Sequence, residues 1–148
     1  DQQPGFGPGL QSGSIGEGFG DYFAVSFGNA FTGNTFEPAC VMDWDATFYT
    51  STVPHCLRRV DENVHFPGDL DGEVHDDGRI WSRALWDIRL ALGNVKADTI
   101  ILQGSFDFPG TTMPDLANRT VAAAKQLYPG KPSVAAAVQK AFADRGIL

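Results

Sequence analysis

Basic residues are scarce in this chain of 148 residues, in which 11 Lys and Arg stand against 18 Asp and Glu and the formal net charge is -7. Proteins that bind nucleic acid gather Lys and Arg into patches that neutralise phosphates. The shortage therefore argues against a nucleic-acid partner. Long apolar runs are also missing, because no stretch approaches the roughly 20 residues needed to cross a bilayer. We accordingly expect no membrane partner.

Cysteine is nearly absent, since the chain holds only Cys40 and Cys56 and no CxxC motif. A zinc site built from cysteines is thereby excluded. The pair flanks a segment rich in threonine and aromatic side chains, and we expect it to be bridged when the protein is made in an oxidising compartment, with free thiols as the alternative. Two free thiols would fit a cytosolic protein, whereas a disulfide would stabilise the fold by about 3 kcal/mol and indicate an oxidising, extracellular compartment.

The remaining composition, 43% hydrophobic and 20% charged, is that of one soluble domain spanning residues 1–148. Residues 1–13 are rich in Gly and Pro and predict a loop. We expect a mainly α-helical bundle. The first helix should begin at Ser14 and end at Gly28 or Ala30, and a second should follow Asp77 as its N-cap and end at Gly93.

Apolar side chains recur at three- and four-residue steps in the C-terminal half and predict the buried faces of the helices. The second helix should turn one such stripe inward: Ile80, Trp81, Ala84, Leu85, Ile88 and Leu92. A short apolar helix is expected over residues 97–103. Another should open at Thr112 and end before Tyr128, and a last one should be capped by Ser133, with Gly146 beyond its end.

Residues 31–77 show no sustained helical period and predict a long irregular excursion with short β pieces, such as residues 46–50. Loops of this length in compact domains are usually functional. We expect Trp44, Phe48 and Tyr49 to anchor the excursion in the core.

The first helix carries two carboxylates four residues apart, Glu17 and Asp21, among the glycines at positions 16, 18 and 20. Side chains at this spacing share a helix face and repel each other unless a cation lies between them. Each glycine costs roughly 1 kcal/mol relative to alanine, which is tolerated where a backbone or ligand comes close. A bound cation is one interpretation. The other is a capping box of Ser14 and Glu17, which leaves Asp21 unexplained.

The segment from Gly13 to Asp21 resembles the one that supplies the third zinc ligand in thermolysin-like and fungalysin-like metallopeptidases. The resemblance implies that Glu17 binds zinc and that Asp21 orients a zinc-binding histidine. The other ligands in that family come from a His-Glu-x-x-His helix, which His55, His65 and His75 do not form. The resemblance therefore implies the C-terminal catalytic lobe of a longer peptidase, whose N-terminal lobe carries His-Glu-x-x-His.

Two further segments match the family. Gly72-Glu73-Val74-His75 resembles the segment bearing its transition-state histidine, so that His75 would donate to a developing oxyanion and Asp71, or Asp69, would orient it. The arginine that binds the substrate carbonyl would be Arg58, with Arg59 as the alternative. A tyrosine that helps to hold the oxyanion in thermolysin would fall near Pro8, so that role is vacant or filled elsewhere. Residues 85–87 and 142–146 are also similar to the family's helices.

These matches imply half of a secreted zinc endopeptidase that acts on peptide or protein substrates and is inert by itself, because one carboxylate cannot hold catalytic zinc. The alternative is a non-catalytic helical module, derived from a peptidase, that binds a partner protein. The retention of Glu17, Asp21 and His75 argues against such decay. A glycosidase fits less well, since carboxylates on adjacent turns lie side by side instead of flanking a sugar.

Overall fold

The computed structural model describes residues 9–33, 36–108 and 110–148. Within these ranges the protein is mainly α-helical, as predicted, with six helices and one small antiparallel hairpin. The elements are α1 (Leu10–Thr32), β1 (Cys40–Val41), α2 (Asp43–Ala46), β2 (Arg58–Arg59), α3 (Val74–Leu92), α4 (Asn94–Ser105), α5 (Met113–Leu127) and α6 (Pro132–Asp144).

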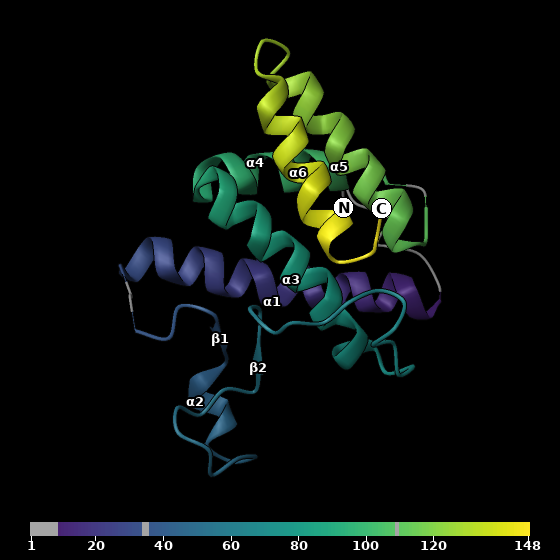
Figure 1. Cartoon of the computed structure of the whole chain (residues 1–148). Coiled ribbons are helices and arrows are strands. Elements are labelled where there is room, and N and C mark those ends of the chain that lie inside the picture. Colours follow the sequence, from purple (N-terminus) through teal and green to yellow (C-terminus); the bar gives the residue numbers. More distant parts are fainter. Residues whose placement is uncertain (1–8, 34–35, 109) are drawn as a thin grey trace.

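Helix α3 is the hub of the fold. It packs most extensively on α1 and also contacts α4 and α6, while α5 packs between α4 and α6. In Figure 1, α1 runs across the molecule with α4, α5 and α6 on one side and the hairpin with α2 on the other. None of the described helices combines the length and the apolar character needed to cross a membrane.

The predicted apolar stripe of α3 forms the centre of the core. Ile80, Trp81, Leu85 and Ile88 are buried, and the Trp81 ring stacks on Phe142 of α6 with 5.2 Å between ring centroids. The stripes predicted for α5 and α6 are buried too, except that Leu127 lies exposed at the end of α5. Helical periodicity thus identified the inward faces correctly.

Helices α1 and α3 touch backbone to backbone at two glycines. A Cβ atom on Gly18 would overlap the carbonyl oxygen of Gly78 and lie 3.0 Å from both the amide nitrogen of Ser82 and Cβ of Trp81. A Cβ on Gly20 would meet nothing within 4 Å. One glycine of the predicted site helix is therefore required by close packing, while another on the same helix is not.

The start of α1 corrects the sequence-based boundary and removes the capping-box interpretation. The helix begins at Leu10, and Ser14 lies inside it with its hydroxyl donating to the Leu10 carbonyl at 2.9 Å. Glu17 is thus a mid-helix residue and caps nothing. The helix ends at Thr32, beyond the predicted stop, because Gly33 adopts φ 66 and its amide returns to the Asn29 carbonyl.

The N-terminal boundaries of α3, α4 and α6 also differ from the prediction. Helix α3 starts at Val74 with Glu73 as its N-cap, so Asp77 is not the cap. Helix α4 is longer than predicted, and α6 is preceded by Lys131 with no side-chain cap, so Ser133 is not its cap. Thr112 caps α5 as expected, accepting the amide of Asp115, and Gly146 adopts φ 73.

The excursion between α1 and α3 contains a projecting segment, residues 36–57, which we call the aromatic lobe. A disulfide joins Cys40 to Cys56, as one of the two sequence alternatives predicted, and Cys40 pairs with Arg59 across the hairpin. The predicted β piece at residues 46–50 is wrong, since α2 and a turn occupy that stretch. The expected anchoring is also wrong, because the three aromatic side chains point outward: Trp44, Phe48 and Tyr49.

Candidate functional site

The carboxylate of Asp21 on α1 is bound by Arg58 from the hairpin. The Arg58 guanidinium donates through Nε to Oδ2 at 2.6 Å and through Nη2 to Oδ1 at 2.8 Å. The two side chains are only 16% and 8% exposed. The bidentate contact with Asp21 is the main reason why the pKa of Arg58 is raised. The cation expected beside the paired carboxylates is therefore, within this chain, an arginine.

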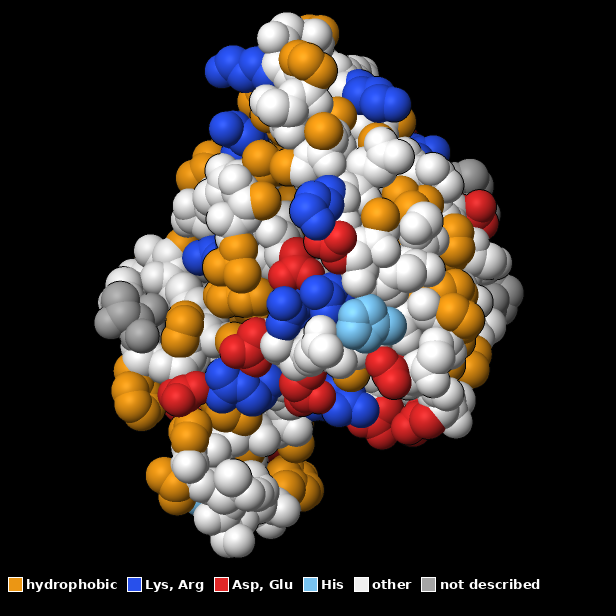
Figure 2. Space-filling model, viewed as in Figure 1, with side chains coloured by type: hydrophobic (Ala, Val, Ile, Leu, Met, Phe, Trp, Pro, Cys, Tyr) orange, Lys and Arg blue, Asp and Glu red, His pale blue; other side chains and the backbone are white. Residues whose placement is uncertain are grey.

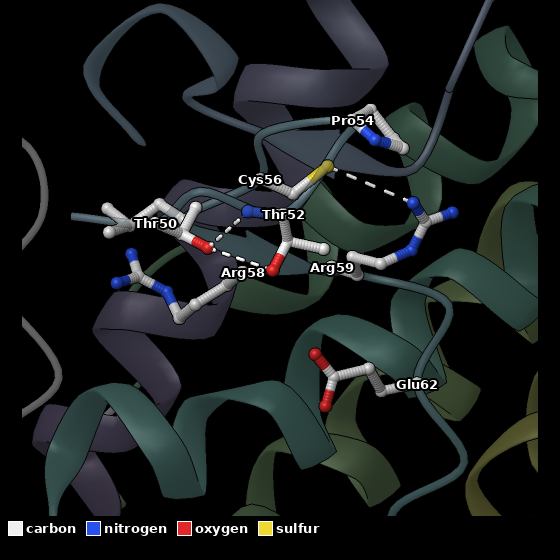
Figure 3. A pocket seen from close by; sticks show the side chains of 8 residues that line it. Thr50, Thr52, Pro54, Cys56, Arg58, Arg59 and Glu62 are labelled. Atoms are coloured by element: carbon white, nitrogen blue, oxygen red, sulfur yellow. Dashed lines mark hydrogen bonds between the residues drawn. The ribbon is translucent and has the colours of Figure 1, made fainter. Parts of the chain in front are cut away.

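Arg59 is directed elsewhere. Neighbouring residues of a strand point to opposite sides, and Figure 3 shows the guanidinium groups of Arg58 and Arg59 extending away from each other. Arg59 instead contacts Asp61 at 2.8 Å and Glu37 at 2.6 Å. Both arginines line a hollow of about 260 Å³ with Thr50, Thr52 and Glu62. Of the two alternatives, only Arg58 joins the carboxylates of α1.

Glu17 and His75 lie together although they are far apart in the chain. His75, in the first turn of α3, places its Nε2 3.4 Å from Oε2 of Glu17 on α1. The side chains are 49% and 40% exposed, so both reach the surface. The crossing of α1 and α3 at Gly18 and Gly78 lies next to them along each helix. The fold thus brings both family-like segments to one side of the molecule.

The carboxylate that orients His75 is Glu73, which corrects the assignment to Asp71 or Asp69. Oε1 of Glu73 lies 2.7 Å from Nδ1 of His75, while Oε2 accepts the amides of His75 and Asp76 as the N-cap of α3. Asp71 instead accepts the amide of Glu73 at 2.8 Å, and Asp69 accepts the amide of His65. A residue that caps a helix two positions before a histidine is within reach of its ring.

Asp77 fixes the loop that leads into His75. Its carboxylate is buried, and Oδ1 accepts the amides of Asp71 and Gly72 at 2.8 and 3.4 Å. The loop therefore turns back onto the first turn of α3, and Glu73 and His75 lie at this bend. The sequence does not reveal this role, because its pattern favours Asp77 as the N-cap of the helix.

The contact with Glu73, assisted by Glu17, raises the pKa of His75, while the same contact lowers the pKa of Glu73. Protonated His75 therefore stabilises the fold fully below its unfolded pKa of about 6.5, and the contribution is lost as pH rises through the folded pKa. Ionised Glu73 stabilises the fold above its unfolded pKa, and this stabilisation is lost as pH falls through its folded pKa.

In NMR titrations, Glu73→Gln should bring the pKa of His75 closer to its ordinary value. Asp69→Asn should leave it unchanged, and an unchanged pKa in Glu73→Gln would contradict the assignment.

A second polar cluster lies deeper between α1, α3 and α4. Tyr22 donates to Asp98 at 2.6 Å, Ser26 donates to the same carboxylate at 2.9 Å, and Arg89 donates to Ser26 at 2.5 Å. Burial, together with Asp98, raises the pKa of the Tyr22 hydroxyl. These groups satisfy one another, so the cluster holds the three helices together and is not a second reactive site.

Charged side chains of both signs form a band across the middle of the face shown in Figure 2. Among the described residues, no group of three or more His, Cys, Asp and Glu side chains is arranged to hold a metal ion. Glu17 offers one accessible carboxylate, His75 a donor of raised pKa and Arg58 a fixed guanidinium. Pro8, near which the resemblance would place the oxyanion-binding tyrosine, lies outside the described residues. The arrangement can offer one metal ligand and two donors to an oxygen-rich substrate.

No protein-family model matches this chain, and a search of curated proteins finds no significant match.

Proposed function

We propose that the chain is the helical C-terminal lobe of a secreted zinc endopeptidase, to which it contributes Glu17 as a zinc ligand and His75 and Arg58 as donors to the substrate. The observation that carries the proposal is the meeting of Glu17 and His75, 3.4 Å apart, with Arg58 held on the next turn of α1 through Asp21. The resemblance assigns these four side chains to one site. If the two segments resembled the peptidase family only by chance, nothing would require them to lie together in the fold.

The carboxylate of Glu17 would supply one part of a zinc site. Glu17 is exposed enough to bind a metal, and carboxylate oxygen is an accepted zinc ligand. Catalytic zinc sites use three protein ligands, so two histidines would come from a segment outside this sequence. When bound, zinc would polarise the scissile carbonyl and lower the pKa of a water molecule. Asp21 would orient one of those histidines with the lone pairs that Arg58 leaves free.

The remaining residues would act on the substrate. His75, whose pKa is raised by its contact with Glu73 and by the charge of Glu17, would donate a hydrogen bond to the oxyanion of the transition state. Arg58 would bind a backbone carbonyl of the peptide, with its guanidinium fixed in direction by Asp21. The disulfide supports secretion, because such bonds persist in oxidising compartments.

The test begins with the coding sequence upstream of Asp1, which we expect to encode His-Glu-x-x-His. In the protein that contains both segments, Glu17→Ala should lose zinc and proteolysis together. His75→Ala should keep zinc and its circular dichroism spectrum but lose about 100-fold or more in kcat, the usual effect of removing one oxyanion donor. Zinc content is measured on the purified variants beside casein hydrolysis. Full zinc retention in Glu17→Ala, or wild-type turnover in His75→Ala, would refute the assignment.

A non-catalytic module that binds a partner protein is the second candidate. The observation in its favour is the outward-facing aromatic lobe, which the helical core does not use. The two candidates separate cleanly, because only the peptidase loses activity when Glu17 or His75 is replaced. A protein that lacks His-Glu-x-x-His throughout its length and still binds a partner through this chain would favour the module.

A further inference from the structure

The aromatic lobe gathers large exposed apolar side chains, and contiguous patches of this kind often mark interaction sites. Five large side chains within it are at least 69% exposed: Phe36, Trp44, Phe48, Tyr49 and Val53. Figure 2 shows hydrophobic side chains on both flanks of the lower projection, where Figure 1 places α2 and the hairpin. The disulfide and the β1–β2 pairing hold the lobe away from the helices, so these side chains do not collapse into the core.

Trp44 and Asp43 stand between two hollows on this lobe. The larger, about 560 Å³, has apolar walls from Phe36, Val53 and Pro54, and the smaller, about 290 Å³, extends along the C-terminal half of α1. Both hollows are lined by Cys40, Asp43 and Trp44. Two adjoining depressions separated by one tryptophan suit an elongated ligand that passes over the indole, with side chains on either side of it.

The charge around the hollows is mainly negative. The first 57 residues contain no Lys or Arg, and the lobe carries Glu37, Asp43 and Asp45. Arg59 neutralises Glu37, but no described cation forms an ion pair with Asp43. Oδ1 of Asp43 accepts the backbone amide of Trp44 at 2.9 Å, which holds the negative charge beside the exposed indole. Such a site favours a cation, which gains both an ion pair and a cation–π contact. The same charge disfavours nucleic acid and anionic lipid.

We propose that the two hollows bind an extended polypeptide segment that places a Lys or Arg side chain against Trp44 and Asp43 and an apolar side chain against Phe36 and Val53. The cation lies over the indole, where a saccharide or a purely apolar helix would leave Asp43 unmatched. Since the cross-linked lobe is already fixed in shape, little ordering is needed on binding. This inference does not depend on zinc or on the peptidase proposal.

The test uses the isolated chain and the probe peptide acetyl-Gly-Leu-Phe-Arg-Leu-Gly-amide, with a matched peptide in which Glu replaces Arg. Trp81 and Trp86 are buried, so a shift in the emission of exposed tryptophan reports Trp44. We expect saturable binding of the Arg peptide with at least about tenfold higher affinity than the Glu peptide. Trp44→Ala should weaken binding about tenfold, measured by anisotropy of a labelled peptide, and Asp43→Asn about threefold.

Matched controls come from the same lobe. Phe48→Ala removes an exposed aromatic ring, and Asp45→Asn removes one negative charge, but neither residue lines the two hollows. Both should leave affinity within about 1.5-fold of the parent. Equal binding of the Arg and Glu peptides, no binding at millimolar concentration, or equal losses in Trp44→Ala and Phe48→Ala would overturn the proposal. So would a dimer in sedimentation equilibrium that Trp44→Ala dissociates, or competition by cello- or chito-oligosaccharides.

Discussion

Replacing Gly18 with alanine should destabilise the protein by at least about 3 kcal/mol. The added methyl group would overlap the Gly78 carbonyl and press on the backbone of Ser82, so no side-chain rotation could relieve the contact. The two helices would have to separate along their main contact, which removes packing from the centre of the core. At the usual scaling for a domain of this size the melting temperature should fall by about 10 °C.

Gly20→Ala is the matched control, because it makes the same chemical change two residues along the same helix. Its Cβ meets nothing within 4 Å, so only the gain in helix propensity remains and stability should rise by up to about 1 kcal/mol. Thermal and urea unfolding followed by circular dichroism measure both variants. Equal effects of the two changes would mean that α1 and α3 do not approach at Gly18.

Arg58→Ala should lower the free energy of unfolding by about 3–5 kcal/mol, because it leaves the carboxylate of Asp21 buried without its cation. The two guanidinium hydrogen bonds are the only ones that the described side chains make to this carboxylate. The hairpin should also detach from α1, since the pair joins β2 to that helix. Urea unfolding at neutral pH gives the difference directly.

Arg59→Ala removes the neighbouring arginine and should cost about 1 kcal/mol or less, because its ion pairs with Asp61 and Glu37 are about one-third exposed. The double variant Asp21→Leu with Arg58→Met should recover most of the stability lost in Arg58→Ala, since no charge is left unpaired. A small loss in Arg58→Ala, equal to that of Arg59→Ala, would show that Asp21 is solvated in solution.

The helices were predictable where apolar periodicity was strong, but their starts were not, except for α5 with its Thr112 cap. The stripe containing Ile80, Leu85 and Ile88 gave α3 its buried face. Its first turn, Val74-His75-Asp76, carries no such period, so the sequence analysis began the helix at Asp77. A glutamate cap is also a weaker signal than the aspartate that followed it. The N-terminal boundary depended on a hydrogen bond that only the folded loop reveals.

The aromatic lobe was misread for a different reason. Burial is a sound expectation for Trp44, Phe48 and Tyr49 as residue types, but it presumes that a core lies within reach. The disulfide and the short hairpin direct this segment away from the helices, and that constraint acts through tertiary structure. The turn at residues 47–49 likewise prevailed over the β propensity of the aromatic and threonine side chains.

Within the candidate site, the sequence could identify Glu17, Asp21, Arg58 and His75 but not how they pair. The shared helix face of Glu17 and Asp21 predicted a nearby cation, and Arg58 supplies it for Asp21. The partner of His75 was misassigned because three acidic residues, Asp69, Asp71 and Glu73, precede it closely in the sequence. Only the position of the helix start distinguishes them, by placing Glu73 beside the ring.

The construction of the aromatic lobe has a consequence for motion. Ala39, Val41 and Ala46 are the buried apolar residues among the lobe's described positions. The lobe is tied to the rest of the fold by features that include the two-residue β1–β2 pairing and the Asn29 side-chain amide, which donates to the Pro38 carbonyl at 2.6 Å. Segments with so little buried surface open locally at a much lower free energy than global unfolding. The lobe's amides should therefore exchange with solvent hydrogen well before those of α3. Such local opening would leave the helical core closed.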